Sequence, residues 1–228
     1  MLTVLYEDNH CLAVAKPAGL LTMGDATGDA TLLDAAKEYI KAKYGKPGAV
    51  FLGVVHRLDR PVSGVVLYAR TTKAASRFSE QFRTHSVEKV YLAAVTGTAI
   101  PTEGELLDWL LKDQKNNRSR SVASDTAGAL ECRLWFRRLQ ETKRGTLLEI
   151  RPQTGRSHQI RVQLATRGWP IQGDSKYGGS KEFLPHAIGL HAWRLTVQHP
   201  VTKEPLSITC PLPGGWKTWG FRELPSES

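Results

Sequence analysis

The sequence contains few cysteines, and none has the spacing of metal ligands. Three occur among 228 residues, Cys11, Cys132 and Cys210, with no CxxC pair. This spacing argues against a zinc centre. An odd number of widely separated cysteines is typical of reduced, mostly buried thiols, so we expect an intracellular, cytoplasmic protein.

Long apolar runs and nucleotide-binding loops are also missing. No apolar run approaches 18 residues, so we expect no membrane span. Residues 1–8 lack a basic segment followed by an apolar core and are not a signal peptide. Neither a GxGxxG after a strand nor a P-loop is present, and no 20–50-residue period repeats. We therefore expect no nicotinamide, flavin or metal cofactor.

Acidic residues are scarce relative to basic ones. Lys and Arg number 31 against 22 Asp and Glu, which gives a formal charge of +9. A chain this basic favours an anionic partner, most often nucleic acid. The most polar window, residues 112–121, has four cations and one anion and predicts an exposed basic loop or hairpin tip. Its cations, Lys115, Arg118 and Arg120 among them, either contact RNA phosphates or belong to a solvated connection.

Apolar periodicity and turn residues divide the chain into strands and helices. Strands are expected at 4–7, 11–16, 51–55, 65–69, 87–96, 129–139, 146–151, 192–199 and 205–210. Helices are expected at 32–44, 73–85 and 158–166, the first capped by Thr31 and the last by Ser157. Strands outnumber helices and mostly follow one another directly. This order predicts an α+β fold on a largely antiparallel sheet, in a single domain over residues 1–228.

One dense polar stretch, residues 56–64, lies between two of these strands. It places Asp59 on a tight connection between Arg57 and Arg60. Arginine can hold a carboxylate through two hydrogen bonds, which keeps it ionised below its usual pKa of about 3.9. An ionised, oriented carboxylate can act as nucleophile or general base. The alternative is an Arg–Asp pair that only pins the loop.

A second dense stretch covers residues 151–165. Arg156 precedes the expected helix, and His158 and Arg161 share one of its faces. A helix start with exposed N–H groups and nearby arginines favours an anion, which would be either a phosphate or Asp59 itself.

Both stretches resemble motifs of one family. Residues 56–64, HRLDRPVSG, resemble the HRLDxxTSG motif of the RluA-type RNA pseudouridine synthases, and residues 154–162, TGRSHQIRV, resemble that family's TGRxHQIRxH motif. Three further pieces fall in the family's order: KPAG at 16–19, EKVYLA at 88–93 and PIQGDSKYG at 170–178. The similarity covers nearly the whole chain and rests on five motifs that occur in the family's order.

The chain departs from the family pattern at two positions. Val62 stands where the family usually has Thr, and Gln163 where it usually has His. Neither is a core catalytic position. We expect a catalytic domain alone, without the S4-type RNA-binding domain of many relatives.

The resemblance implies an enzyme that isomerises uridine in RNA to pseudouridine, with a central active-site cleft in a sheet flanked by helices. It implies Asp59, Tyr91 and Arg161 as catalytic residues. Asp59 would attack C1′ of the ribose or take a proton from C2′, and Arg161 would pair with it. Tyr91 would stack on the base or serve a late proton transfer; without the resemblance it is interpreted as a packing residue.

The expected partner is RNA, as a stem-loop of ribosomal or transfer RNA, bound by a monomer that needs neither a metal nor a membrane. The contacts are expected from Arg57, Arg60, Arg156, His158, Lys115, Arg118 and Arg120.

Two other functions remain as alternatives. A glycoside hydrolase would need a second carboxylate, for which Asp174 is a candidate. A non-catalytic RNA-binding protein of the same fold is the other, and the presence of Asp59, Tyr91 and Arg161 together favours the enzyme.

Overall fold

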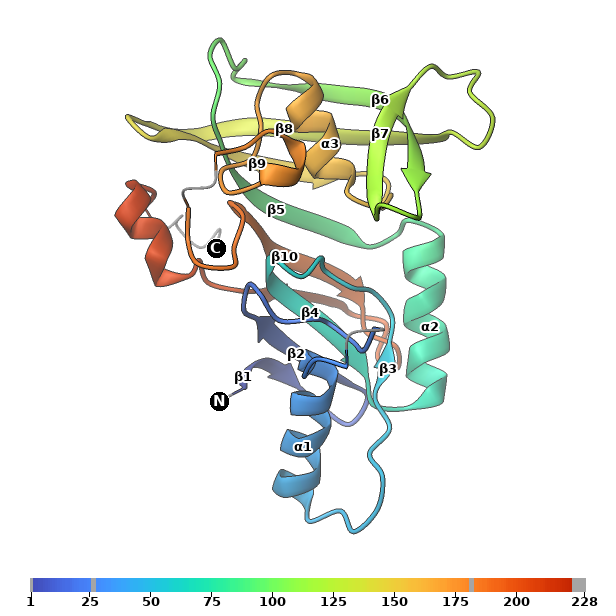
Figure 1. Ribbon diagram of the computed structural model, residues 1–228. Helices are drawn as coiled ribbons and strands as arrows, with labels where there is room; N and C mark the ends of the chain where they lie inside the picture. Colours follow the sequence, from blue (N-terminus) through green and yellow to red (C-terminus); the bar gives the residue numbers. More distant parts are fainter. Residues whose placement is uncertain (1, 26–27, 181–182, 223–228) are drawn as a thin grey trace. The chain divides into compact units, whose positions relative to one another are not determined.

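The computed structural model describes residues 2–25, 28–180 and 183–222. The chain forms two compact units, one from residues 1–89 and 192–210 and the other from residues 90–191 and 211–228. Eleven strands and three α-helices occur over the described residues (Figure 1). No helix in this part of the chain is both long and apolar enough to cross a membrane. The α+β class is confirmed, while the single domain over residues 1–228 stays a prediction.

The first unit is a sheet with two helices. Its strands follow the order β1-β2-β4-β10, with β3 on β4 and β11 on β10, and β1–β2, β2–β4 and β10–β11 are antiparallel. Every residue of β4 is buried, as expected of an interior strand. The elements are β1 Thr3–Glu7, β2 Cys11–Lys16, α1 Leu32–Tyr44, β3 Gly53–Val54, β4 Ser63–Ala69, α2 Thr72–Arg83, β10 Leu190–Gln198 (from residue 192) and β11 Pro205–Thr209.

Helix α1 begins and ends where the sequence predicts. The Thr31 side chain accepts a hydrogen bond from the N–H of Asp34. Gly45 ends the helix in the left-handed conformation, with φ 57°. Buried Leu32 and Ile40 hold its apolar face on the sheet.

The second unit is an antiparallel sheet of order β5-β9-β8-β6-β7. Helix α3 packs on one face of it, where Val162 meets Leu110 and Cys132. The elements are β5 Glu88–Val95 (from residue 90), β6 Glu103–Asp113, β7 Arg118–Val122, β8 Leu130–Thr142, β9 Gly145–Pro152, α3 Gln159–Thr166 and two 3₁₀ turns, η1 Ser175–Tyr177 and η2 Gly214–Trp219.

Two predictions for the second unit were incomplete. The sequence indicated no strand before the basic window, but residues 103–113 form the eleven-residue β6, and the window itself is the end of β6, a turn and most of β7. Helix α3 was expected to be capped by Ser157. Its N-cap is instead His158, in the left-handed conformation with φ 55° and no side-chain capping bond.

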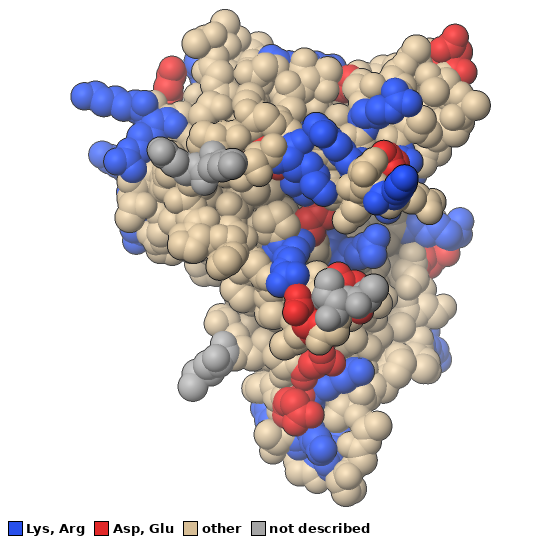
Figure 2. All heavy atoms as spheres, viewed as in Figure 1, with Lys and Arg blue, Asp and Glu red and all other residues tan. Residues whose placement is uncertain are grey.

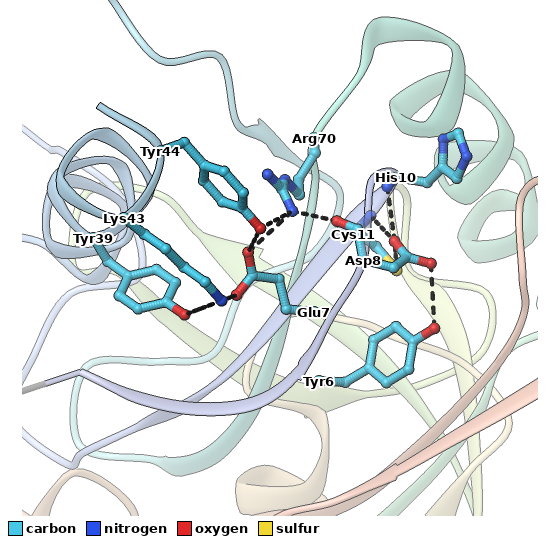
Figure 3. Close-up of polar contacts among 9 residues, drawn as sticks. All are labelled: Tyr6, Glu7, Asp8, His10, Cys11, Tyr39, Lys43, Tyr44 and Arg70. Atoms are coloured by element: carbon cyan, nitrogen blue, oxygen red, sulfur yellow. Dashed lines mark hydrogen bonds and ion pairs between the residues drawn. The ribbon is translucent and has the colours of Figure 1, made fainter. Parts of the chain in front are cut away.

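A buried carboxylate, Glu7, ties α1 to the sheet of the first unit (Figure 3). One of its oxygens accepts hydrogen bonds from Tyr39 at 2.7 Å and Lys43 at 2.6 Å. The other accepts from Tyr44 at 2.6 Å and Arg70 at 3.1 Å. Four donors around one carboxylate that is 8% exposed satisfy it without water.

We predict that Glu7→Gln lowers the free energy of unfolding by about 2–3 kcal/mol at pH 7, because a charged acceptor is lost from a buried cluster. Burial by itself raises the Glu7 pKa, but the hydrogen bonds from Lys43, Tyr44 and Tyr39 outweigh it and lower the pKa to about 2. The carboxyl is thus more acidic in the folded chain than in the unfolded one. Its stabilisation is complete above about pH 5 and is lost as pH falls toward 2.

Urea unfolding at several pH values measures this effect. The parent should lose stability between pH 5 and pH 3 more steeply than Glu7→Gln. Glu80→Gln is the matched control, since Glu80 and its partner Arg83 are 56% and 71% exposed and should contribute nothing measurable. Parallel pH dependences of the parent and Glu7→Gln would show that Glu7 is not the source.

Candidate active site

Asp59 lies on the connection between β3 and β4, as predicted. The connection turns through a bond from the N–H of Val62 to the carbonyl of Asp59, at 3.0 Å. Leu58 is buried, and both its N–H and its carbonyl bind the hydroxyl of Thr22, at 3.1 and 3.0 Å. The backbone before Asp59 is thereby fixed, while Asp59 itself is only partly buried.

The buried ammonium group of Lys16 donates hydrogen bonds to the same loop. Lys16 is 1% exposed, and its Nζ donates to the carbonyls of Leu20 at 2.6 Å, Arg60 at 3.0 Å and Pro17 at 3.1 Å. Burial lowers the Lys16 pKa to about 7, and the negative charge of Asp59 opposes this shift. From the sequence we predicted Lys16 only as the end of a strand and as part of the KPAG piece, with no role of its own. The signal that could have identified it was its place in the KPxG resemblance.

The Arg60 guanidinium, expected beside Asp59, has partners elsewhere in this unit. Its Nε donates to the carbonyl of Gly19 at 3.0 Å, and its Nη1 pairs with Asp29 at 2.8 Å. The side chain remains half exposed, and Arg57 is exposed. Arg60 thus links the loop to residues 19 and 29.

His56, the first residue of the motif, supports the strand that follows it. Its Nε2 accepts a hydrogen bond from the N–H of Leu67 at 2.9 Å, and its ring stacks on Phe82 at 4.8 Å. Burial, with a smaller contribution from the charge of Lys89, lowers the His56 pKa to about 4. A neutral ring that accepts at Nε2 carries its proton on Nδ1, so His56 acts as a fixed acceptor.

Glycine is required where the loop enters β4. Gly64 has φ +127°, and a Cβ there would lie 2.3 Å from the carbonyl oxygen of Ala192 on β10. Only a residue without a side chain allows this approach. The glycine that ends the motif therefore follows from how closely β4 and β10 pack.

The second unit carries Tyr91 and Arg161. Tyr91 lies on β5 opposite Ile150 of β9 and is partly buried. Arg161 lies on α3 and pairs with Asp174 through two hydrogen bonds, Nε to Oδ2 at 2.7 Å and Nη2 to Oδ1 at 2.8 Å. Sequence reasoning did not connect Arg161 with Asp174. The pairing of Arg161 with Asp59 stays a prediction.

Tyr177 connects this ion pair to the β6–β7 hairpin. Its hydroxyl lies 2.7 Å from Nδ1 of His158 and accepts a hydrogen bond from the N–H of Ser119 at 2.9 Å. Its ring lies 5.1 Å from the guanidinium carbon of Arg161 and 5.2 Å from that of Arg118. His158, expected to contact RNA, is therefore buried against Tyr177.

The departure at Gln163 has a structural explanation. Gln163 is fully buried, and its amide donates to Asp108 at 2.9 Å and to the carbonyl of Leu106 at 3.1 Å. Asp108 also accepts from Arg167 at 2.7 Å. Gln163 thus supplies a hydrogen-bond donor that joins α3 to β6, and the position is structural here. Val62, the other departure, is buried in the first unit.

A groove of about 580 Å³ lies between the β6–β7 hairpin and α3. Arg118, Arg120 and Ser121 line the hairpin side, and Val162 and Thr166 line the helix side. Lys and Arg side chains gather over this region of the second unit (Figure 2). Arg156 is anchored nearby, since its Nε donates to the carbonyl of Glu131 at 3.1 Å. The hairpin has the chemistry to contact phosphates.

Among the described residues, one cluster has metal-ligating side chains within reach of one another: Asp8, Cys11 and His199. Nδ1 of His199 faces the N–H groups of residues 201 and 202, so the ring proton lies on Nε2 and is donated to Asp8 at 2.7 Å. Burial raises the pKa of the Cys11 thiol, which keeps it protonated. A metal ion would have to displace both protons. The cluster fits a hydrogen-bonded link between the β1–β2 turn and the end of β10.

Comparison with known proteins places these residues in a family. The sequence pattern of RNA pseudouridylate synthase matches residues 10–166. The chain is 36% identical over 227 residues to ribosomal large subunit pseudouridine synthase D of Xylella fastidiosa, covering 93% of this chain and 66% of that protein. It is 31% identical to tRNA pseudouridine synthase C of Vibrio cholerae, covering 95% of this chain and 93% of the relative.

A solved structure agrees with the sequence matches. The structure titled human RNA pseudouridylate synthase domain containing 4 aligns with a TM-score of 0.77 at 25% identity, covering 93% of this chain and 89% of that one. The similarity includes both stretches that carry the site residues. The chain belongs to the RNA pseudouridylate synthase family.

Proposed function

We propose that the protein is an RNA pseudouridine synthase that isomerises specific uridines in structured RNA. The observation that carries the proposal is the match over residues 10–166, which includes Asp59, Tyr91 and Arg161 at the positions of the family's motifs. The fixed backbone around Asp59 and the rigid mounting of Arg161 support it, because catalysis of this kind needs charges held in place.

The proposed reaction conserves every atom of the nucleotide. The bond from N1 of uracil to C1′ breaks, a bond from C5 to C1′ forms, C5 loses its proton to solvent, and N1 takes up a proton. Asp59 starts the reaction either by attacking C1′ or by taking the C2′ proton. Either route uses Asp59 as an ionised carboxylate, and Arg161 is its proposed partner. Tyr91 would stack on the uracil or transfer the late proton.

We propose ribosomal or transfer RNA as the substrate, bound by a monomer in the cytoplasm. The relatives' names refer to both RNA classes, and the +9 charge supports phosphate contacts. The three cysteines lie outside disulfides, as is usual in a reducing compartment. Arg57, Arg60, Arg156 and the hairpin cations are the proposed contacts. The Asp174 carboxylate, which a glycoside hydrolase would need, is engaged in a buried ion pair.

We predict that Asp59→Asn abolishes isomerisation and leaves RNA binding nearly intact, because the amide is neither nucleophile nor base. Tritium release from [5-³H]uridine-labelled RNA should fall by at least about 10³-fold. Filter binding measures the affinity of the same preparation. Mapping of carbodiimide adducts in total RNA, with and without the gene, identifies the uridine.

Asp125→Asn is the matched control. It makes the same charge change at an exposed residue and should keep the parent rate. Substantial turnover by Asp59→Asn would overturn the assignment of Asp59, and the absence of lost pseudouridines together with no tritium release by the parent would overturn the proposed function.

We also predict that the Gln substitution of Lys115, Arg118 and Arg120 together weakens RNA binding. It should reduce the slope of log affinity against log salt by about 1 for each lost phosphate contact. The control replaces three exposed lysines of the first unit, Lys41, Lys46 and Lys73, and removes the same charge. Equal slopes for the two triple variants would make the hairpin a solvated connection.

A further inference from the structure

The ion pair between Arg161 and Asp174 is almost completely buried, and a contribution to the stability of the fold does not by itself explain why two charges lie there. The side chain of Arg161 is 6% exposed and that of Asp174 is 1% exposed. Removing two charges from water costs several kcal/mol per ion, and well-packed apolar residues often stabilise a fold equally well. A buried pair with two short hydrogen bonds therefore points to a use beyond stability.

We propose that Asp174 is a positioning residue for the reaction, which holds the guanidinium of Arg161 in one fixed orientation. The inference rests on the proposed function. It adds to that function a residue that does not itself touch the nucleotide and acts through Arg161.

The orientation follows from which nitrogen atoms Asp174 binds. Its carboxylate takes Nε and Nη2, the side edge of the planar guanidinium. The end edge, formed by Nη1 and Nη2, is the edge that a second carboxylate would bind. Because Asp174 binds the side edge, the guanidinium of Arg161 cannot rotate about the bonds at the end of its side chain. Its end edge therefore keeps one direction.

The loop around Asp174 is built to keep that carboxylate still. The Asp174 carbonyl accepts hydrogen bonds from the N–H groups of Tyr177 at 3.0 Å and Gly179 at 2.8 Å. A Cβ on Gly179 would lie 2.1 Å from the carbonyl oxygen of Ile171, and Gly173 has φ +79°. The glycines on both sides of Asp174 thus permit a fold too tight for other residues.

Tyr177 covers the face of the same guanidinium. Its ring lies 5.1 Å from the guanidinium carbon, a cation–π distance. His158 and the N–H of Ser119 hold its hydroxyl, so the ring has little freedom. One edge and one face of Arg161 are therefore fixed by a single loop.

The test compares Asp174→Asn with the parent in single-turnover tritium release at saturating RNA. We expect the rate to fall by about 10²-fold, because a misplaced guanidinium misplaces its partner. RNA affinity should stay within about 2-fold, because Asp174 does not contact the substrate. In an Arg161→Ala background the same substitution should cost nothing further, since residues that act through one another are not additive.

A second ion pair, at the C-terminal end of the same helix, provides the control; its arginine, Arg167, is 27% exposed. Asp108 on β6 accepts two hydrogen bonds from Arg167, at 2.7 and 2.8 Å, and is 9% exposed. Asp108→Asn should lower the melting temperature and keep the single-turnover rate at a temperature where the protein is folded. A structural role for Asp174 would make the two variants behave alike.

If Asp174→Asn does not fold, Asp174→Glu serves as the test variant. It keeps the charge and moves the carboxylate by one methylene, so it should fold, bind RNA and lose rate. Rates of the Asp174 variants equal to the parent's, or losses that add to that of Arg161→Ala, would overturn the positioning role. An inactive parent would instead overturn the proposed function.

Discussion

The loop that carries Asp59 depends on the buried ammonium group of Lys16. Three carbonyls converge on its Nζ, and one of them belongs to Arg60, the residue after Asp59. A buried ammonium group is tolerated when hydrogen bonds use its donors, and here three loop carbonyls accept them. Thr22 fixes the other side of Asp59 by binding both polar groups of Leu58. The loop is therefore held by hydrogen bonds on both sides of Asp59.

In the second unit, Arg161 is also held in place by buried contacts. Its guanidinium is held by a carboxylate on one edge and an aromatic ring on one face. The ring in turn depends on His158 and on the backbone of the β6–β7 hairpin. Backbone carbonyls thus hold Lys16 in the first unit, and a buried carboxylate with an aromatic ring holds Arg161 in the second. Such mounting keeps a site in position without reorganisation during the reaction.

The β6–β7 hairpin has exposed arginines on one face and a buried serine that binds Tyr177 on the other. Arg118 and Arg120 extend from it, as befits contact with phosphate, while its Ser119 is buried and holds Tyr177. The hairpin that we propose as an RNA contact is therefore connected, through Ser119 and Tyr177, to the loop that holds Arg161. The alternation of exposed and buried residues along β7 makes this possible, because neighbouring side chains point to opposite faces.

Local periodicity, caps and turn residues were enough to predict the fold class, most of the strands, the limits of α1 and the position of Asp59 on a tight connection. Strand β6 escaped prediction because its buried face includes Asp108, which only the tertiary contacts with Arg167 and Gln163 make tolerable. The roles of Lys16 and Asp174 were likewise decided by tertiary structure. A buried lysine or aspartate looks like a surface residue in sequence until the chain brings its partners together.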